Sequence, residues 1–285
     1  MSEQLKDIKP QLVDTLPPQR ESFYLLLDGA LMDVPLLAYS HDDQPVVEQL
    51  YRNTRHESAL SVSPCLIKPS ADTRLWQQQM QWQSKGVVLR STEPVALLSQ
   101  HLKSLLSVRL PSQQLAYCRY YSPTWLVRLL KTLSLPERRA WSGPVEAWYA
   151  NSPEGWVYFQ DDAQGVARTA EEEGWFALKQ TQLEQWQAEE HQRFIDKAAE
   201  HLGCESKATA HGLEQRTRVA TLTDAARDLG FVLEYQCLHY LELAWRFPQE
   251  LLSPQLAHLL ADRDQDAEQR LQLAEQQLFG LNRDV

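Results

Sequence analysis

Two stretches of the sequence carry carboxylate and imidazole groups at spacings typical of metal sites. The first, DRDQD at 262–266, opens like the calcium loop of an EF-hand, in which alternating carboxylates converge on one hard cation. The match ends there, because Ala267 stands where the loop requires glycine and Leu273 where a bidentate glutamate belongs. The second, His239 with Glu242, lies one helical turn apart but lacks the further ligands of an HExxH-type site. We therefore expect no metal at either stretch.

No motif that activates a nucleophile or cradles a phosphate occurs in the sequence. A GxSxG elbow, a GxGxxG loop and a GxxxxGK[ST] loop are all absent. With eight histidines and 38 acidic residues, scattered His–acid neighbours are expected by chance. We predict that the protein is not an enzyme and uses no cofactor. A hydrolase whose site is assembled from residues remote in sequence stays an alternative.

The charge of the chain is uneven along its length. The 285 residues, 43% of them hydrophobic, are enough to bury a large core without disulfides. The net charge is −10, with +2 on residues 1–150 and −12 on residues 151–285. Because an acidic surface repels phosphate backbones, we expect no nucleic-acid partner.

The cysteines and the lack of long apolar runs indicate the compartment. The four cysteines lie far apart without a CxxC pair, which is typical of reduced thiols in the cytoplasm. The first twenty residues contain acids and three prolines instead of the basic start and apolar stretch of a secretory signal. No later window approaches the roughly 18 uncharged apolar residues that a membrane span needs. We expect a soluble, cytoplasmic protein without membrane insertion.

Strand-like and helix-like runs alternate through the first part of the chain. Short apolar or aromatic runs next to Gly, Pro and Ser predict strands, and three- and four-residue apolar spacing predicts helices. A hairpin with its turn at 161–165 would extend the sheet at its edge. We expect strands at 23–28, 63–69, 86–90 and 115–122, helices at 44–53 and 71–83, after Ser91-Thr92 with apolar residues from Val95 to Leu105, and from Pro123, and the hairpin at 155–168.

After Trp175 the apolar residues recur at the spacing of a helix. Leu183, Trp186, Phe194, Ala198 and Leu202 form one stripe, which Gly203 closes. We expect a fold of the α+β or α/β class, with a small mixed sheet flanked by helices followed by an all-helical lobe. The expected divisions are an N-terminal arm at 1–22, the sheet-containing lobe at 23–176 and the helical lobe at 177–285.

Four segments in order resemble a known family. They are FYLLLDGALMDVPLL, SVSPCLIKPS, VVLRSTEPVALLSQHLKSLLSV, and CRYYSPTWLVRLLKTL followed by WSGPVEAWY. Together they look like the domain of unknown function numbered 4123, a family of adaptor-chaperones of bacterial type VI secretion systems. The resemblance spans residues 23–149, and the helical tail, with AARDLGFVLEYQCLHYLELA, is similar to the C-terminal lobe of that family.

The resemblance implies a cytoplasmic protein that binds a toxic effector and loads it onto the spike protein of the secretion tube. The family's strand-end Asp corresponds to Asp28, and its Arg-aromatic-Tyr-Asp-Pro segment corresponds to residues 119–123. Here Ser122 replaces the Asp and offers only a neutral hydrogen bond. An assembly or scaffold protein of another complex stays the alternative. The family-motif residues, structural or partner-binding, are Asp28, Arg119, Tyr121, Pro123 and Gly143.

We predict a structural role for Asp28 and Arg119 and a cargo-binding role for a further set of aromatic and apolar residues. Asp28 and Arg119 should form a structural pair, because a charge delivered by an apolar strand needs a partner and Arg is the best donor available. Aromatic and apolar residues of both lobes should hold cargo in the groove between the lobes, since aromatics bury much area with few rotors. The alternative is that the aromatics are all core. The predicted groove residues are Trp141, Trp148, Tyr149, Trp156, Tyr158, Leu233, Tyr240 and Trp245.

Overall fold

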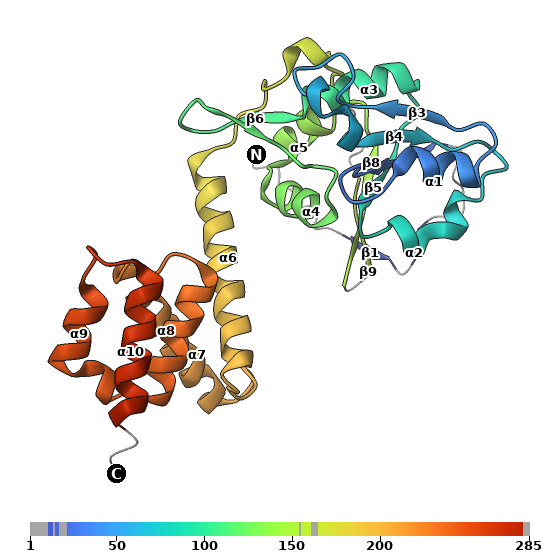
Figure 1. Cartoon of the computed structure of the whole chain (residues 1–285). Coiled ribbons are helices and arrows are strands. Elements are labelled where there is room, and N and C mark those ends of the chain that lie inside the picture. Colours follow the sequence, from blue (N-terminus) through green and yellow to red (C-terminus); the bar gives the residue numbers. More distant parts are fainter. Residues whose placement is uncertain (1–10, 14, 17–21, 154, 161–164, 282–285) are drawn as a thin grey trace, which may run out of the picture. The chain divides into compact units, whose positions relative to one another are not determined.

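The computed structural model describes residues 11–13, 15–16, 22–153, 155–160 and 165–281, and the chain divides into two compact units (Figure 1). Unit 1 spans Met1–Gln185 and contains every described strand. Unit 2 spans Trp186–Val285, and its described secondary structure is helical. The helical part starts with helix α6 (Gln180–His201), close to the residue 177 expected from the sequence. The predicted fold, a sheet with helices followed by a helical region, is confirmed.

A sheet forms the centre of unit 1. Its seven described strands are β1 (Gln11–Val13), β2 (Phe23–Leu27), β3 (Val46–Gln49), β4 (Cys65–Lys68), β5 (Gly86–Arg90), β8 (Ala147–Ser152) and β9 (Gly155–Gln160). They lie in the order β1-β9-β8-β5-β2-β4-β3, and each neighbouring pair is antiparallel. The pairing is more uniform than the mixed sheet that we expected, and it places the unit in the α+β class.

Strand β2 lies inside the sheet because all five of its residues are apolar or aromatic. All five are buried, and the strand pairs with β4 on one side and β5 on the other. Leu25 lies opposite Ile67 of β4 and Val88 of β5. A strand covered on both faces is a continuous apolar run in the sequence, which is why this strand was predicted.

Helices and a small second sheet surround the main sheet. Helix α4 packs against β8, and α1 packs against β4. Asp33 caps α1, accepting a hydrogen bond from the Leu36 amide at 3.0 Å. The helices are α1 (Val34–His41), α2 (Gln79–Trp82), α3 (Val95–Ser104), α4 (Pro123–Thr132) and α5 (Leu135–Ser142), with 3-10 segments at Glu57–Val62, Leu75–Gln78 and Ala170–Glu172. The second sheet pairs β6 (Ser107–Arg109) with β7 (Leu115–Tyr117).

The helix predicted at 44–53 was wrong. Its centre is strand β3, in which Val46 lies opposite Lys68 and Val47 opposite Ile67. β-branched side chains fit a pleated surface well, so pairing with β4 overrides the helical spacing. The strand predicted at 115–122 is likewise shorter, because only the three residues of β7 pair, and they pair with β6 outside the main sheet.

The hairpin predicted at 155–168 lies earlier in the chain. Its two strands are β8 and β9, with Ser152 opposite Gly155. Of the turn predicted at 161–165, residues 161–164 lie outside the described residues, and residues 165–169 form no strand. The expected extension of the sheet is nevertheless present, because β9 also pairs with β1.

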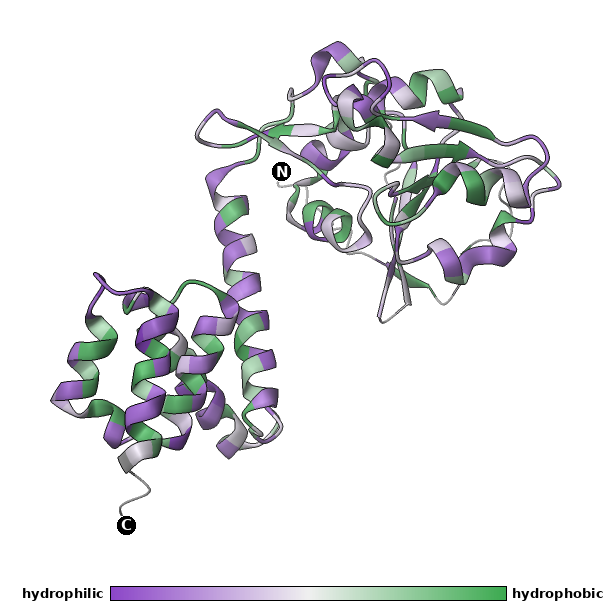
Figure 2. Cartoon of the chain, viewed as in Figure 1, coloured by the Kyte–Doolittle hydropathy of each residue, from purple (hydrophilic) through white to green (hydrophobic). Residues whose placement is uncertain are grey.

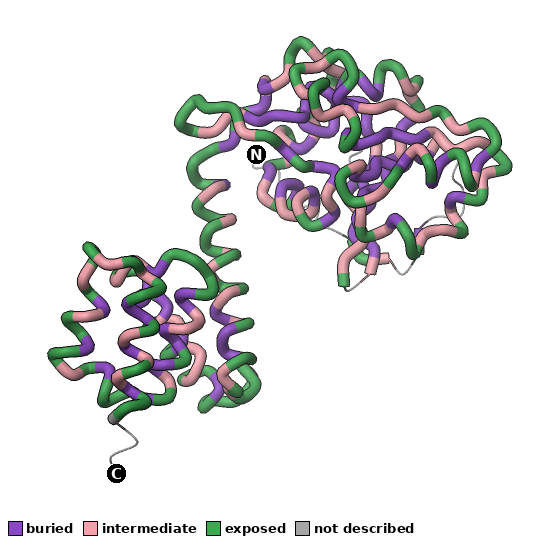
Figure 3. Tube along the Cα trace, viewed as in Figure 1, coloured by how far each residue is buried: buried purple, intermediate pink, exposed green. Residues whose placement is uncertain are grey.

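Unit 2 is built from amphipathic helices, whose hydrophobic and hydrophilic residues alternate along each helix (Figure 2). Their buried residues form one core that includes Phe231, Leu243 and Leu271, and a second around Ile195 and Leu241 (Figure 3). None of the described helices combines the length and apolarity that crossing a bilayer requires. After α6 the helices are α7 (Ala210–Asp228), α8 (Glu234–Arg246), α9 (Pro254–Ala261) and α10 (Ala267–Leu281), with a 3-10 turn at Glu250–Leu252.

Candidate functional site

An ion pair between Asp28 and Arg119 joins two distant parts of unit 1. Asp28 follows β2 directly and is 1% exposed. One carboxylate oxygen accepts from the Ala30 amide at 2.9 Å, and the other accepts from the Arg119 guanidinium. The next residue must be glycine, because a Cβ on Gly29 would lie 2.2 Å from the Ser63 carbonyl oxygen.

Arg119, the partner of the buried Asp28 carboxylate, lies partly at the surface. Its side chain is 49% exposed, and its guanidinium lies 5.9 Å from the centre of the Tyr121 ring. The hydrogen bond to Asp28 raises the pKa of Arg119, so the guanidinium keeps its charge. The structure thus places the predicted partners together, although Arg119 follows β7 of the small sheet and not a strand of the main one. The structural role of the pair stays a prediction.

Three tyrosine hydroxyl groups meet beside this pair, and we name Tyr51, Tyr117 and Tyr121 the tyrosine cluster. The Tyr117 hydroxyl bonds to the hydroxyl of Tyr121 at 2.8 Å and to that of Tyr51. Tyr51 and Tyr121 are buried, whereas Tyr117 is 41% exposed. Burial raises the pKa of both Tyr117 and Tyr121, so these phenols stay neutral donors and acceptors at physiological pH.

A second carboxylate, that of Glu173, is connected to Tyr117 through His56. Glu173 accepts hydrogen bonds from Ser107 at 2.6 Å, from His56 at 2.8 Å and from Arg55. Burial alone would raise the pKa of Glu173, but these donors outweigh it and lower the pKa. The His56 ring lies 5.2 Å from the Tyr117 ring, which connects Glu173 to the tyrosine cluster.

The exposed side of this arrangement is a surface of aromatic, arginine and leucine side chains. We name Arg55, Leu115, Tyr117 and Arg119 the β7 patch. Each is at least two-fifths exposed, yet each rests on buried polar or packed groups below. Leu115, for instance, packs against the backbone of Gly174, where a Cβ would lie 2.5 Å from a Leu115 methyl carbon. Tyr and Arg on a well-supported base are typical of binding hot spots.

The remaining family-motif residues stabilise the local backbone. Pro123 is the first residue of α4, and the Ser122 side chain gives that helix no capping hydrogen bond. Gly143 ends α5 with φ +54°, and a Cβ there would lie 2.3 Å from the His101 ring. His101 is fully buried; one ring nitrogen lies 2.9 Å from the Trp141 carbonyl oxygen, and the other accepts from the Arg168 amide at 3.2 Å. Burial lowers the pKa of His101 to about 4.

Most residues of the predicted cargo groove lie inside their own unit. Trp141, Trp148, Tyr149 and Trp156 are all buried in unit 1, and Trp148 donates to the Ser142 hydroxyl at 3.0 Å. Tyr158 is half-buried and stacks on Tyr149 with ring centres 5.6 Å apart. In unit 2, Tyr240 is buried, Trp245 half-buried and Leu233 exposed. The structure shows where each residue lies and does not test the groove, which stays a prediction.

The residues considered for metal binding have other roles. Asp266 accepts from the Glu268 amide at 2.9 Å, at the start of α10. His239 pairs with Glu275, and Glu242 with His201. Within the ranges that the structure describes, no group of three or more His, Cys, Asp or Glu side chains is arranged to hold a metal ion.

Sequence reasoning found Asp28, Arg119 and Tyr121 but missed Tyr51, His56, Tyr117 and Glu173. These residues come from three separate segments, namely the loop after β3, strand β7 and the segment after the 3-10 turn at Ala170–Glu172, and no spacing in the sequence connects Glu173 with the others. The 3-10 turn before it and the backbone bonds of Arg109 with Phe176 and Leu178 bring it beside β6. Only the tyrosines at 117, 120 and 121, close together in the chain, gave a local signal.

Comparison with known proteins supports the resemblance over part of the chain. Residues 23–140 match the family described as Domain of unknown function (DUF4123), which is less than half of the chain. The matched segment contains Asp28, Arg119 and the three tyrosines of the cluster. No curated protein and no solved structure matches the chain. The similarity of the helical tail to the family's C-terminal lobe stays a prediction.

Proposed function

We propose that this protein is a cytoplasmic adaptor-chaperone that binds a toxic effector and loads it onto the spike of a type VI secretion system. The observation that carries the proposal is the match of residues 23–140 to the DUF4123 family, whose resemblance implies that role. The protein acts by binding and not by catalysis. Its partners are the effector and the spike protein.

The β7 patch supports this proposal as a surface for contact with a partner. Its two arginines already neutralise Asp28 and Glu173, so a partner that covers them buries compensated charge. Tyr117 offers a large ring whose hydroxyl is held by two others, and little side-chain freedom is left to lose on binding. Phenols with a raised pKa are weak acids that stay protonated near neutral pH, so no phenolate is available as a general base, which favours recognition over proton transfer at this place.

The experiment that tests the proposal is quantitative co-purification from the native cell. Affinity-tagged full-length protein should bring down one effector and the spike protein. Tyr117→Ala should lose one of these partners while keeping its fold, measured by circular dichroism. Tyr39→Ala is the matched control, because Tyr39 is 63% exposed on α1 and belongs to no described hydrogen bond.

Two outcomes would contradict the proposal. If the folded wild-type protein enriches neither an effector nor a spike protein, the adaptor role is wrong, and the partners that it does enrich would identify a scaffold of another complex. If Tyr117→Ala retains both partners as fully as Tyr39→Ala, the β7 patch is not the contact surface. A broad screen for hydrolase activity on the purified protein tests the enzymatic alternative.

A further inference from the structure

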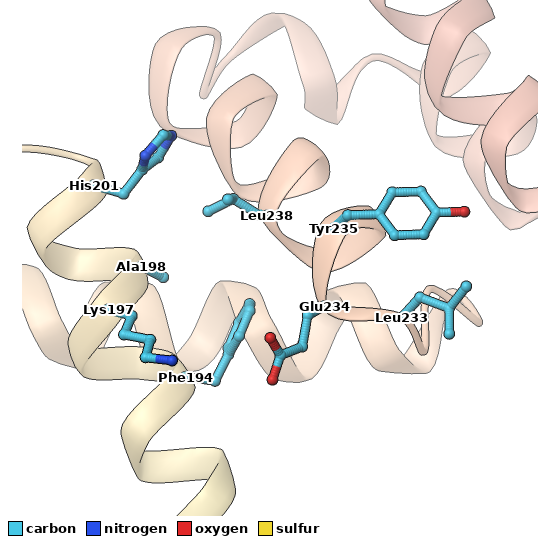
Figure 4. Close-up of a pocket in the computed structure, with 8 residues that line it drawn as sticks. All are labelled: Phe194, Lys197, Ala198, His201, Leu233, Glu234, Tyr235 and Leu238. Atoms are coloured by element: carbon cyan, nitrogen blue, oxygen red, sulfur yellow. The ribbon is translucent and has the colours of Figure 1, made fainter. Parts of the chain in front are cut away.

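Unit 2 contains an open pocket between helices α6 and α8, outside the residues that match the family. Its volume is about 620 Å³, within the range of roughly 300–1,000 Å³ typical of ligand pockets. Phe194 and Ala198 of α6 face Leu238 of α8 across it, as Figure 4 shows. The lining residues are Phe194, Lys197, Ala198, His201, Leu233, Glu234, Tyr235 and Leu238.

Large apolar side chains are exposed at the start of α8, and two of them, Leu233 and Tyr235, line this pocket. Val232, Leu233 and Tyr235 are 75%, 50% and 55% exposed. These three large apolar side chains lie within four residues of sequence, whereas exposed apolar residues are normally scattered singly over a protein surface, so we treat them as one patch. The neighbouring Phe231, Gln236 and Cys237 are buried, so the local backbone is fixed by packing on its other face. Covering this patch would therefore require no refolding of α8.

The charged groups at the pocket indicate what covers it. At one end His201 and Glu242 pair with each other at 2.6 Å. At the other end Lys197 and Glu234 lie on either side of Phe194, and within the described chain neither makes a hydrogen bond or an ion pair (Figure 4). Unit 2 as a whole has 17 acidic and 10 basic residues, so its field attracts a positively charged partner.

We propose that the α6–α8 pocket is a docking site for a basic amphipathic helix of a partner protein. The apolar side chains of that helix fill the space between Phe194 and Leu238 and cover Leu233. A Lys or Arg beside them pairs with Glu234. This site goes beyond the proposed function, because it lies outside residues 23–140 and is independent of the β7 patch.

The dimensions suit a helix of two to three turns. The lining residues of α6 run from Phe194 to His201, which is about 10 Å along the axis at 1.5 Å per residue. A helix that crosses two others presents side chains at i, i+3 or i+4, and i+7, so two or three anchors reach the pocket. Such an element would pack as an additional helix of the bundle, with an axis separation of about 8–10 Å.

The test measures binding of three synthetic peptides to the full-length protein by fluorescence anisotropy at low salt. The first is helical, with leucines at i, i+3, i+4 and i+7 and lysines on the other face. The second has glutamates in place of the lysines. The third has the composition of the first in an order that destroys the apolar face. We expect the first to bind at least about tenfold more tightly than either of the others, a difference of about 1.4 kcal/mol.

Two variants locate the binding, and one serves as the matched control. Leu233→Asn and Glu234→Gln should each weaken binding of the first peptide about fivefold or more, as expected for an anchor and for a partly exposed charge pair. Leu252→Asn removes an equally apolar side chain, 75% exposed and outside the pocket, and should bind like the wild type. All three positions are exposed, so folding should be retained, which circular dichroism checks.

Equal binding of the three peptides, or equal affinities of Leu233→Asn and Leu252→Asn, would overturn the proposal. Sedimentation of the protein alone tests whether a second copy of this chain, and not a partner helix, covers the pocket. A dimer that Leu233→Asn dissociates would mean that a second copy of this chain covers the pocket, and the proposed partner helix would be wrong. Failure of these peptide experiments would leave the co-purification of effector and spike unaffected, so the two proposals fail separately.

Discussion

Removing the guanidinium of Arg119 tests how unit 1 tolerates a buried charge. In Arg119→Ala, the Asp28 carboxylate keeps the Ala30 amide as a donor but loses its counter-charge. At 1% exposure it cannot be solvated where it is. Arg55→Ala is the matched control, because Arg55 is exposed to a similar extent and also pairs with a carboxylate whose side chain is only 9% exposed. That carboxylate, Glu173, keeps its hydrogen bonds from other side chains.

The expected loss of unfolding free energy differs between the two variants because only Asp28 is left without a second side-chain donor. Breaking a fully buried ion pair costs about 3–5 kcal/mol, and because Arg119 is half-exposed we expect about 2 kcal/mol for Arg119→Ala. For Arg55→Ala we expect less than about 1 kcal/mol, the usual value of an exposed pair. In a unit of this size, about 2 kcal/mol lowers the melting temperature by roughly 4–8 °C.

Thermal and urea unfolding, followed by circular dichroism, measure both variants. The double variant Asp28→Asn with Arg119→Ala removes the buried charge and keeps an acceptor for the Ala30 amide, so it should be more stable than Arg119→Ala alone. The reasoning is refuted if Arg119→Ala is no less stable than Arg55→Ala, or if the double variant recovers nothing. Unchanged stability of Asp28→Ala with lost cargo binding would instead make Asp28 a contact residue.

The remaining predictions concern the core of unit 1. Gly143→Ala should lower the free energy of unfolding, measured with urea, by about 2–4 kcal/mol, because the new Cβ would contact the His101 ring and φ is +54°. The control Gly203→Ala, with open space around it, should lower it by only about 1 kcal/mol. Folded His101 takes up its proton near pH 4 and unfolded His101 near pH 6.5, so its contribution is intact above pH 6.5 and falls by up to about 3 kcal/mol towards pH 4. The free energy of unfolding that the wild type loses between pH 7 and pH 4.5 should be larger than the loss in His101→Gln. Equal losses in the wild type and in His101→Gln would contradict this reasoning. Trp148→Ala should cost about 3–5 kcal/mol, and a variant that stays as stable as wild type but loses cargo would favour the predicted groove.

How far the sequence predicts the fold depends on whether the pattern is local. Strands β2, β4 and β5 were predicted because buried strands are continuous apolar runs between breakers, and the helical part of the chain because its apolar residues recur at helical spacing, with the first stripe closed by Gly203. Strand β3 was missed because its two valines and the following Leu50 and Tyr51 fit a helix as well as a strand. Only its pairing with β4, a contact between distant residues, decides the conformation.

In the candidate site, too, only contacts with a local signal in the sequence could be predicted. The pair of Asp28 and Arg119 could be predicted, because a buried acid at a strand end requires a partner and the family motif supplied an arginine. The link from Tyr51 through Tyr117 to His56 and Glu173 could not, since it depends on how loops cross the small sheet. The exposure of Tyr235 was equally hidden, because in sequence it continues the apolar pattern of α8, whereas Leu233 was already predicted to face a partner.

Deleting the gene and following secretion tests the central claim most directly. The account predicts that one effector disappears from the culture medium, that the secretion tube is still assembled and released, and that the plasmid-borne wild-type gene restores the effector. Continued secretion of every effector in the deletion strain would contradict the adaptor role. Loss of the tube itself would contradict it as well, and would assign the protein to assembly of the machine.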